Sequence, residues 1–443
     1  MEFITGITLQ IFALIIVLTI KRRRWFSSTG AIFVVMIFVL HGVIEIISRV
    51  FFKDILTARE NFFIGKNDVD SFVLYVGVAL FIFSIVYGIT QYGLPLPKKI
   101  KTELSPEKKS LNFKSVFLVC LLLLPAIFLV GLSEEESGYW VNGILVTFLM
   151  PITIISLCWF LIKNNFEHAI FWVAILALSI TALGSRSTVM LSVAATLSIL
   201  FRYGMSFNLR KLIPISFVVM SLVFTIFMTR SVIGRKSIST LDGLDRAKSG
   251  IESVQAVLQS NDGTFFSTND IVKEFVGRLD ANFFGSLIYS ILRIYPPPGF
   301  SSMWIDVELA IPRFLNKSNT KVDEEDLFEK HYYLREIDYA PHVFGSLYAY
   351  SGLSSLWIGA AFLALLYGFV DRWLSFKYSL NSIIIEYFLL VATFHMESGI
   401  KLYFAAFRTS LFLVVVLTII YFILRLFKKQ SILEIEMCDK TDK

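Results

Sequence analysis

The chain has 443 residues, 56% of them hydrophobic, a mean hydropathy of +0.69 and a net charge of +6. Soluble domains carry about 45–50% apolar residues, so this composition excludes a soluble enzyme and predicts an all-α, polytopic integral membrane protein. The three cysteines, Cys120, Cys158 and Cys438, are too few and too scattered for a disulfide framework, and no Cys/His pattern indicates a metal or cofactor site.

Apolar stretches long enough to cross a bilayer recur along the chain, since about 20 helical residues span its hydrocarbon core. The first stretch has no basic segment before it and no small-residue cleavage site after it, so we interpret it as a retained span. The eleven predicted spans lie near residues 3–20, 30–48, 71–92, 113–132, 140–162, 168–184, 187–203, 212–230, 343–370, 379–395 and 401–424.

The distribution of Lys and Arg predicts the orientation of these spans. With residue 1 outside, the cytoplasmic loops and tail hold 21 Lys/Arg and the short outer loops hold 6. An excess of Lys/Arg marks cytoplasmic loops, so we predict a multi-pass membrane protein with its N-terminus outside and its C-terminus in the cytoplasm. This bias accounts for most of the net charge, and no nucleic-acid partner is indicated.

One long hydrophilic segment separates two groups of spans. The expected organisation is spans 1–8 in residues 1–230, a large extracytoplasmic loop at 231–342, spans 9–11 in residues 343–424, and a cytoplasmic tail at 425–443. Helical spacing of apolar residues recurs at 244–258. The stretch 271–295 resembles an amphipathic helix lying along the membrane surface and stopped by the prolines at 296–298.

Ionisable residues in spans are costly and usually functional. His41, Glu45 and Arg49 are four residues apart in the second span, so they share one helix face that leads outward. This spacing suits a functional site, and it equally suits a stripe of residues that only pair with one another.

Arginines on the outer side are candidate anion ligands, because the guanidinium group offers forked donors to phosphate. Arg186 stands at the tip of a hairpin between two apolar stretches, beside serines. Arg408 lies about two turns inside the last span, where Glu45 or Glu397 is a candidate partner. The further candidates, each also explained by a solvated or salt-bridged loop residue, are Arg230, Arg278, Arg293, Arg313 and Arg335.

His342 immediately precedes the ninth span, so we expect its ring at the membrane–water boundary with a pKa near neutrality. Leu347 and Gly352 follow it at intervals of five residues. The stretch HVFGSLYAYSGLSSLWIGAAFLALLYG is similar to the segment after the large periplasmic loop of bacterial O-antigen polymerases and ligases, where a histidine precedes a leucine and a glycine at such spacing.

Two further stretches resemble oligosaccharide repeat-unit polymerases of the Wzy type. GSRSTVMLSVAATLSILFRYG resembles their Gly-x-Arg hairpin, and WIDVELAIPRFLNKSN resembles their Ile-Pro-Arg segment. The resemblance covers roughly residues 180–375. Val343 stands where the ligases carry a small polar residue, which favours the polymerases, although Lys317 is not followed by the proline common among them.

The resemblance implies a metal-independent, inverting glycosyltransferase without a cofactor, located in the bacterial cytoplasmic (inner) membrane. Its donor would be a growing glycan on a polyprenyl diphosphate, and its acceptor a second lipid-linked repeat unit; membrane lipid and a chain-length regulator protein are the other expected partners. His342 would be the general base, with Glu45 the next candidate. Arg186, Arg278, Arg313, Arg408 and Arg230 would bind the diphosphate.

Three other functions remain open on the sequence. The first is an O-antigen-ligase-like glycan transferase. The second is a flippase or transporter of lipid-linked oligosaccharide, for which charges spread through the membrane midplane would be expected. The third is a polyprenyl-phosphate-sugar glycosyltransferase whose base is Asp68 or Asp70 in the first outer loop.

Overall fold

The computed structural model describes residues 1–21, 28–51, 64–93, 150–162, 194–200, 202, 281–310, 324–334, 341–374, 380–395, 399–415 and 418–419. Every regular element in these ranges is helical, which confirms the all-α prediction for this part of the chain. The predicted spans near 113–132, 168–184 and 212–230, the helix at 244–258 and the tail at 425–443 lie outside the described residues. The count of eleven spans therefore stays a prediction.

Four helices in the described ranges are long and apolar enough to cross a membrane. They are α1 (Glu2–Lys21), a continuous helix made of α2 (Thr29–Ile37), η2 (Phe38–Val43) and α3 (Ile44–Phe51), then α5 (Lys66–Tyr92) and α19 (Leu353–Leu374). Two shorter apolar helices are α8 (Met150–Ile162) and α20 (Leu380–Phe394). These apolar helices indicate a membrane protein.

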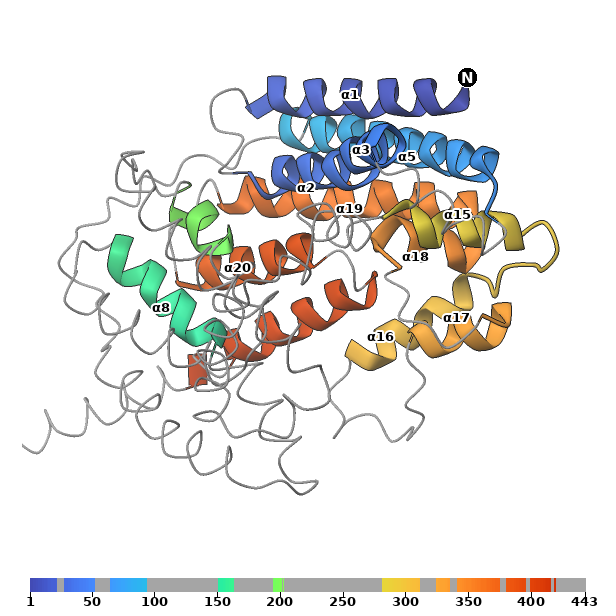
Figure 1. The fold of residues 1–443 in the computed structure, drawn as a ribbon. Coiled ribbons are helices and arrows are strands. Elements are labelled where there is room, and N and C mark those ends of the chain that lie inside the picture. Colours follow the sequence, from blue (N-terminus) through green and yellow to red (C-terminus); the bar gives the residue numbers. More distant parts are fainter. Residues whose placement is uncertain are drawn as a thin grey trace, which may run out of the picture.

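The long helices lie side by side in layers, with α1 above α5 and α2, and α19 and α20 below them (Figure 1). Two glycines let α1 and α5 approach each other closely. A Cβ added at Gly77 would lie 2.5 Å from the carbonyl oxygen of Gly6, and one added at Gly6 would lie 2.7 Å from the carbonyl oxygen of Val73. Small residues of this kind let membrane helices pack backbone to backbone.

Polar contacts fix the direction of each helix. The Ser71 hydroxyl donates to the Glu2 carboxylate at 2.6 Å, and Lys21 Nζ donates to the Gln91 side-chain oxygen at 2.9 Å, so α1 and α5 are parallel. Ser28, just before α2, lies 2.7 Å from the hydroxyl of Tyr87, late in α5, so α2 runs the opposite way. We call the two ends of this bundle the Glu2 end and the Lys21 end.

Helices of the predicted loop segment pack at the Glu2 end. The first, α15 (Asn282–Ile291), presses on α5 so closely that a Cβ at Gly285 would lie 1.9 Å from Phe72 Cζ. Most residues of its first two turns are buried. α15 is amphipathic and ends before the prolines at 296–298, as predicted, while its position along the membrane surface stays a prediction.

Three further helices of this segment follow: η4 (Phe300–Met303), α16 (Trp304–Ala310) and α17 (Glu324–Tyr332). They rest on α18 (Val343–Ser351) through backbone and hydroxyl contacts. The Gly299 N–H donates to the Tyr350 carbonyl at 2.7 Å, and the Tyr332 hydroxyl donates to the Ala349 carbonyl.

The predicted ninth span is not one helix. It breaks at Gly352, whose φ of 66° and ψ of −139° end α18 and precede α19. Only glycine adopts this backbone conformation without strain, which explains the residue at this position. Gly352 therefore separates a short helix that packs on α15 from the longer α19.

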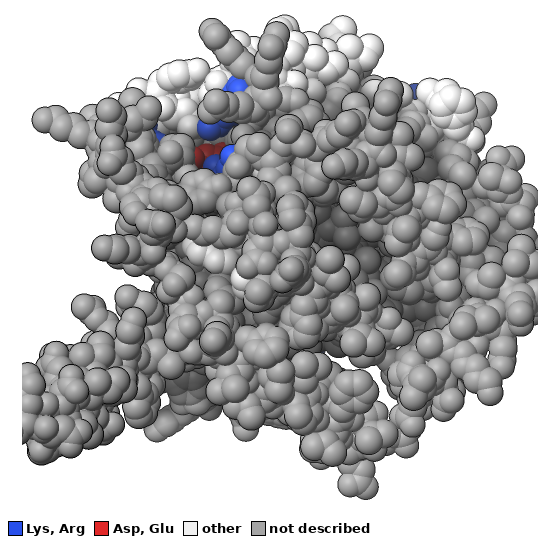
Figure 2. All heavy atoms as spheres, turned by 90° about the vertical axis from the view of Figure 1, so that its left-hand side faces the viewer, with Lys and Arg blue, Asp and Glu red and all other residues white. Residues whose placement is uncertain are grey.

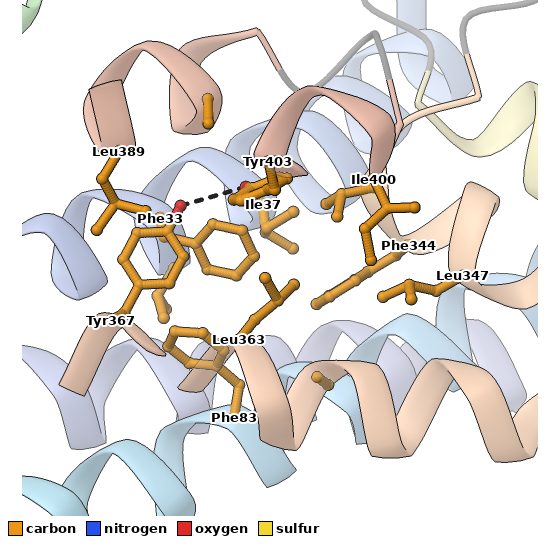
Figure 3. Close-up of a cluster of buried hydrophobic side chains, with 14 of the residues drawn as sticks. Phe33, Ile37, Phe83, Phe344, Leu347, Leu363, Tyr367, Leu389, Ile400 and Tyr403 are labelled. Carbon is orange, nitrogen blue, oxygen red and sulfur yellow. Dashed lines mark hydrogen bonds between the residues drawn. The ribbon is translucent and has the colours of Figure 1, made fainter. Parts of the chain in front are cut away.

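Aromatic side chains from α2, α5 and α19 form the centre of the core (Figure 3). The Phe33 ring stacks on Phe83 at 4.8 Å and lies 4.9 Å from the Tyr367 ring. The Tyr367 hydroxyl donates to the Tyr403 hydroxyl at 3.2 Å. Phe344 closes the core toward the Glu2 end, so the helix that begins after His342 is anchored directly in this packing.

Candidate active site

Two buried histidines meet at the Glu2 end. His41 is 0% exposed and His342 is 1% exposed, and their ring centroids are 6.0 Å apart at an interplanar angle of 70°. They belong to helices far apart in the sequence, since His41 lies in η2 and His342 caps the start of α18. With Glu45, Arg49 and Asn282 they form what we call the histidine cluster.

His342 is held in a strained backbone conformation. Its φ is 47° and its ψ is 152°, a combination that only glycine adopts readily. Neither ring nitrogen has a hydrogen-bond partner within the described part of the chain. Strain and an unpartnered buried polar group both cost stability, and such features gather at functional sites.

His41 is oriented by a side chain that sequence reasoning did not single out. Its Nδ1 lies 2.8 Å from Asn282 Oδ1, and Asn282 Nδ2 donates both to the His41 carbonyl at 3.0 Å and to Glu45 Oε2 at 3.2 Å. Asn282 is the first residue of α15. The loop segment thus supplies the link between His41 and Glu45.

Glu45 and Arg49 pair along the helix face, as their spacing predicts. Arg49 Nε donates to Glu45 Oε1 at 2.7 Å, and the guanidinium also lies 2.7 Å from Asp70 Oδ1. The Glu45 side chain is fully buried. His41 shares this face but reaches Glu45 only through Asn282, so the stripe is not simply self-paired.

The position predicted for His342 is wrong in one respect. The ring does not lie at an exposed boundary but is buried, and burial, with the nearby His41, lowers its pKa to about 3. Burial in an apolar setting disfavours the charged imidazolium. The imidazole is therefore neutral at physiological pH, and the expectation of a pKa near neutrality does not hold for this state.

Of the five arginines predicted to bind the diphosphate, the structure describes one. Arg186, Arg230, Arg278 and Arg313 lie outside the described residues. Arg408 lies in the helical stretch 401–415 and is partly exposed. Their role as anion ligands remains a prediction.

Arg293, another arginine of the predicted loop segment, is held by an ion pair and an aromatic ring. Arg293 pairs with Asp68 Oδ1 at 2.8 Å, and its guanidinium lies 4.8 Å from the ring centroid of Tyr289. Asp68 also accepts a bond from the Gly65 backbone N–H at 2.9 Å, which caps the start of α5. These contacts connect the chain just after α15 to the start of α5.

A second polar cluster, at the Lys21 end, was not predicted. The Asp371 carboxylate accepts bonds from the Ser28 hydroxyl at 2.7 Å, from the Thr29 and Gly30 backbone N–H groups at 2.8 and 3.0 Å, and from the Tyr87 hydroxyl at 2.7 Å. A carboxylate at the N-terminus of α2 also complements the helix dipole.

The Asp371 carboxylate also accepts a bond from Arg202 at 2.7 Å, and Arg202 in turn donates to Glu386. Figure 2 views this end, where basic and acidic side chains of described residues meet in one small group. Since Glu386 lies inside an apolar helix, the rule that charges within spans are significant could have identified it. The pairing makes this group a structural connection between α2, α19 and α20.

Metal binding has no support within the described ranges, where no group of three or more His, Cys, Asp or Glu residues could hold an ion. Comparison of the chain with protein-family models, with curated protein sequences and with solved structures gives no match. The proposed function therefore rests on the chemistry of the histidine cluster.

Proposed function

We propose that the protein polymerises polyprenyl-diphosphate-linked oligosaccharide repeat units at the outer face of a bacterial cytoplasmic membrane. An acceptor hydroxyl oxygen attacks the anomeric carbon of the donor sugar and forms the new glycosidic bond. The bond from that carbon to the diphosphate breaks, and the polyprenyl diphosphate leaves with its electron pair. The hydroxyl proton passes to His342, and a single in-line displacement inverts the anomeric centre.

His342 is the single observation that carries this proposal. A neutral, buried imidazole with two unpartnered nitrogens is able to accept a proton without first losing one. Its low pKa makes it a weak base in the free protein, but an anionic diphosphate bound nearby would raise that pKa. The strained backbone at this residue supports a functional role, because such strain costs stability and clusters at active sites.

Lipid-linked substrates also need apolar surface beside the site. An open hollow in the loop segment is lined by Phe300, Ser301, Met303, Trp304 and Val307, and its exposed lining is mostly apolar. The segment that carries it rests on α18, the helix that begins at His342. This apolar surface suits a polyprenyl chain, and it meets α18 at Tyr350, at the end of that helix opposite to His342.

Stabilisation of the leaving diphosphate is assigned to arginines, and Arg186 is the first candidate. Arg186→Lys should strongly impair polymerisation, because an ammonium keeps the charge but loses the forked donor geometry. Full-length polymer from Arg186→Ala at a normal protein level would remove this residue from the proposed site.

The rival functions fit the described residues less well. The polyprenyl-phosphate-sugar transferase needs a free aspartate as base, yet Asp68 pairs with Arg293 and Asp70 with Arg49. A transporter would use charges at the membrane midplane, whereas the ion pair of Arg49 and Asp70 lies toward the Glu2 end and the charged Asp371 lies toward the Lys21 end. The ligase-like transferase would use the same base and is separated from the polymerase by experiment.

The proposal requires the histidine cluster to face outward. Glu2, His41 and Asn282 lie at one end of the bundle, which agrees with the prediction that the N-terminus and the 231–342 loop share a side. Reporter fusions at Asn261 and Lys429 should therefore give opposite sidedness. The same side for both would overturn the orientation and with it the proposed site.

Surface glycan from a deletion strain tests the function directly. A polymerase predicts loss of long chains with a single repeat unit retained on the lipid carrier or its final acceptor. Loss of all attached glycan would instead indicate a ligase, and accumulation of the lipid-linked unit on the cytoplasmic side would indicate a flippase. Either of these results contradicts the proposal.

A further inference from the structure

We propose that His41 accepts a hydrogen bond from a hydroxyl group of an uncharged acceptor sugar, and that Asn282 and Glu45 position its ring for this contact. The inference rests on the proposed polymerase function and deepens it, because it assigns the acceptor subsite to the His41 side of the histidine cluster. It also separates that subsite from the arginines expected to bind the diphosphate.

The hydrogen bonds around Asn282 determine which nitrogen of His41 carries the proton. The Glu45 carboxylate and the His41 carbonyl can only accept, so the Asn282 amide nitrogen must face them, as it does at 3.2 and 3.0 Å. The Asn282 amide oxygen then faces His41 Nδ1 at 2.8 Å, and this oxygen can only accept. The neutral ring therefore carries its hydrogen on Nδ1 and keeps a lone pair on Nε2.

The Nε2 atom of His41 is buried and has no partner within the described part of the molecule. An unsatisfied buried acceptor costs stability, and natural proteins keep few of them. The residue also lies in η2, a short π-helix, and such interruptions of α-helices occur frequently at functional sites. The burial of Nε2, its free lone pair and the π-helix at this position all indicate a ligand that donates a hydrogen bond.

The charges around His41 favour a neutral ligand over a phosphate. Arg49 is the cation of the histidine cluster, and it pairs with the two carboxylates of Glu45 and Asp70, each at 2.7 Å. It therefore offers no uncompensated positive charge to an anion.

Nuclear magnetic resonance of the purified full-length protein, labelled with 15N-histidine, tests the positioning directly. The His41 signal, identified by its absence in His41→Gln, should show a protonated Nδ1 and a bare Nε2 at neutral pH. Asn282→Leu should abolish this fixed pattern, and the His331 signal should not change. A protonated Nε2 in the wild-type protein, or an unchanged pattern in Asn282→Leu, would overturn the inference without touching the proposed function.

The same labelled protein tests the ligand. Lipid-linked repeat unit extracted from the deletion strain should shift the His41 Nε2 resonance on binding, whether or not turnover occurs. Inorganic diphosphate should leave this resonance in place. The absence of a shift with saturating repeat unit, or an equal shift with diphosphate, contradicts an acceptor-sugar subsite.

Kinetics in vesicles with the same extracted repeat unit distinguish the hydrogen-bond acceptor of His41 from the shape of its ring. His41→Phe keeps an aromatic ring but no acceptor, so its KM should rise about tenfold or more, as expected for the loss of one buried hydrogen bond. His41→Gln restores an acceptor oxygen and should retain more activity. Equal KM values for the wild type and a folded His41→Phe would refute the role. A wild-type protein that binds the repeat unit and forms no polymer would refute the proposed function instead.

Discussion

Replacing His342 by glycine and by alanine measures the cost of its backbone strain. At φ 47° and ψ 152°, any residue with a Cβ is strained by about 1–3 kcal/mol, and glycine is not. Both variants lose the same imidazole, so they differ in the Cβ alone. The greater entropy of the unfolded chain with glycine lowers the stability of His342→Gly by about 0.4–1 kcal/mol. His342→Gly should therefore be more stable than His342→Ala, by up to about 2.6 kcal/mol.

Equilibrium unfolding in mixed detergent micelles measures this difference, and a second pair of variants provides the control. Ser354 is exposed and lies in the ordinary helix α19. Because Ser354 lies in the first turn of α19, Ser354→Ala should be more stable than Ser354→Gly, the usual helical order, by less than the roughly 1 kcal/mol typical of helix interiors. If His342→Ala equals or exceeds His342→Gly in stability, the strain argument is refuted. Both His342 variants should lose polymerising activity in either case.

Three other predictions concern packing, the second polar cluster and pH. Gly77→Ala should destabilise the protein by about 1–3 kcal/mol in unfolding measurements, because its Cβ would meet backbone at 2.5 Å, whereas Gly88→Ala, which meets only the end of a flexible side chain at 3.2 Å, should be nearly neutral. Asp371→Asn should lower the free energy of unfolding by about 3–5 kcal/mol and reduce the yield of folded protein. It breaks a buried ion pair in which every partner of the carboxylate is a donor. The pKa of His342 is about 3 in the folded protein, below its ordinary value, so the unfolded chain binds the extra proton first. Stability relative to His342→Gln should therefore fall as pH drops below about 6.5, by up to about 1.4 kcal/mol per pH unit, and constant relative stability between pH 7 and 4.5 would contradict this.

Sequence patterns predicted the local features of this protein well. Apolar stretches located the four long helices, and the four-residue spacing of Glu45 and Arg49 predicted their ion pair. The prolines at 296–298 correctly marked a limit for the preceding helix. Each of these features depends on residues that are neighbours along the chain, so the sequence carries the signal directly.

Features that depend on tertiary contacts could not be predicted in the same way. Asn282 lies more than 200 residues from His41, and nothing in its neighbours indicates that α15 would bring it there. The burial of His342 follows from tertiary packing, with the His41 ring 6.0 Å away and α18 against α15, and not from its position beside a span. Glu386 could have been found as a charge inside an apolar helix, but its partner Arg202 could not.

Polymer formation by the purified protein tests the central claim most directly. Vesicles that contain the wild-type protein and extracted lipid-linked repeat unit should produce a ladder of glycans with free polyprenyl diphosphate released. His342→Gln should slow this by about 10²–10⁴-fold at an unchanged level of folded protein, because glutamine cannot take the hydroxyl proton. His331→Gln, which removes a histidine outside the cluster, should form the same ladder as the wild type. A normal ladder from His342→Gln, or none from the wild-type protein, would contradict the account.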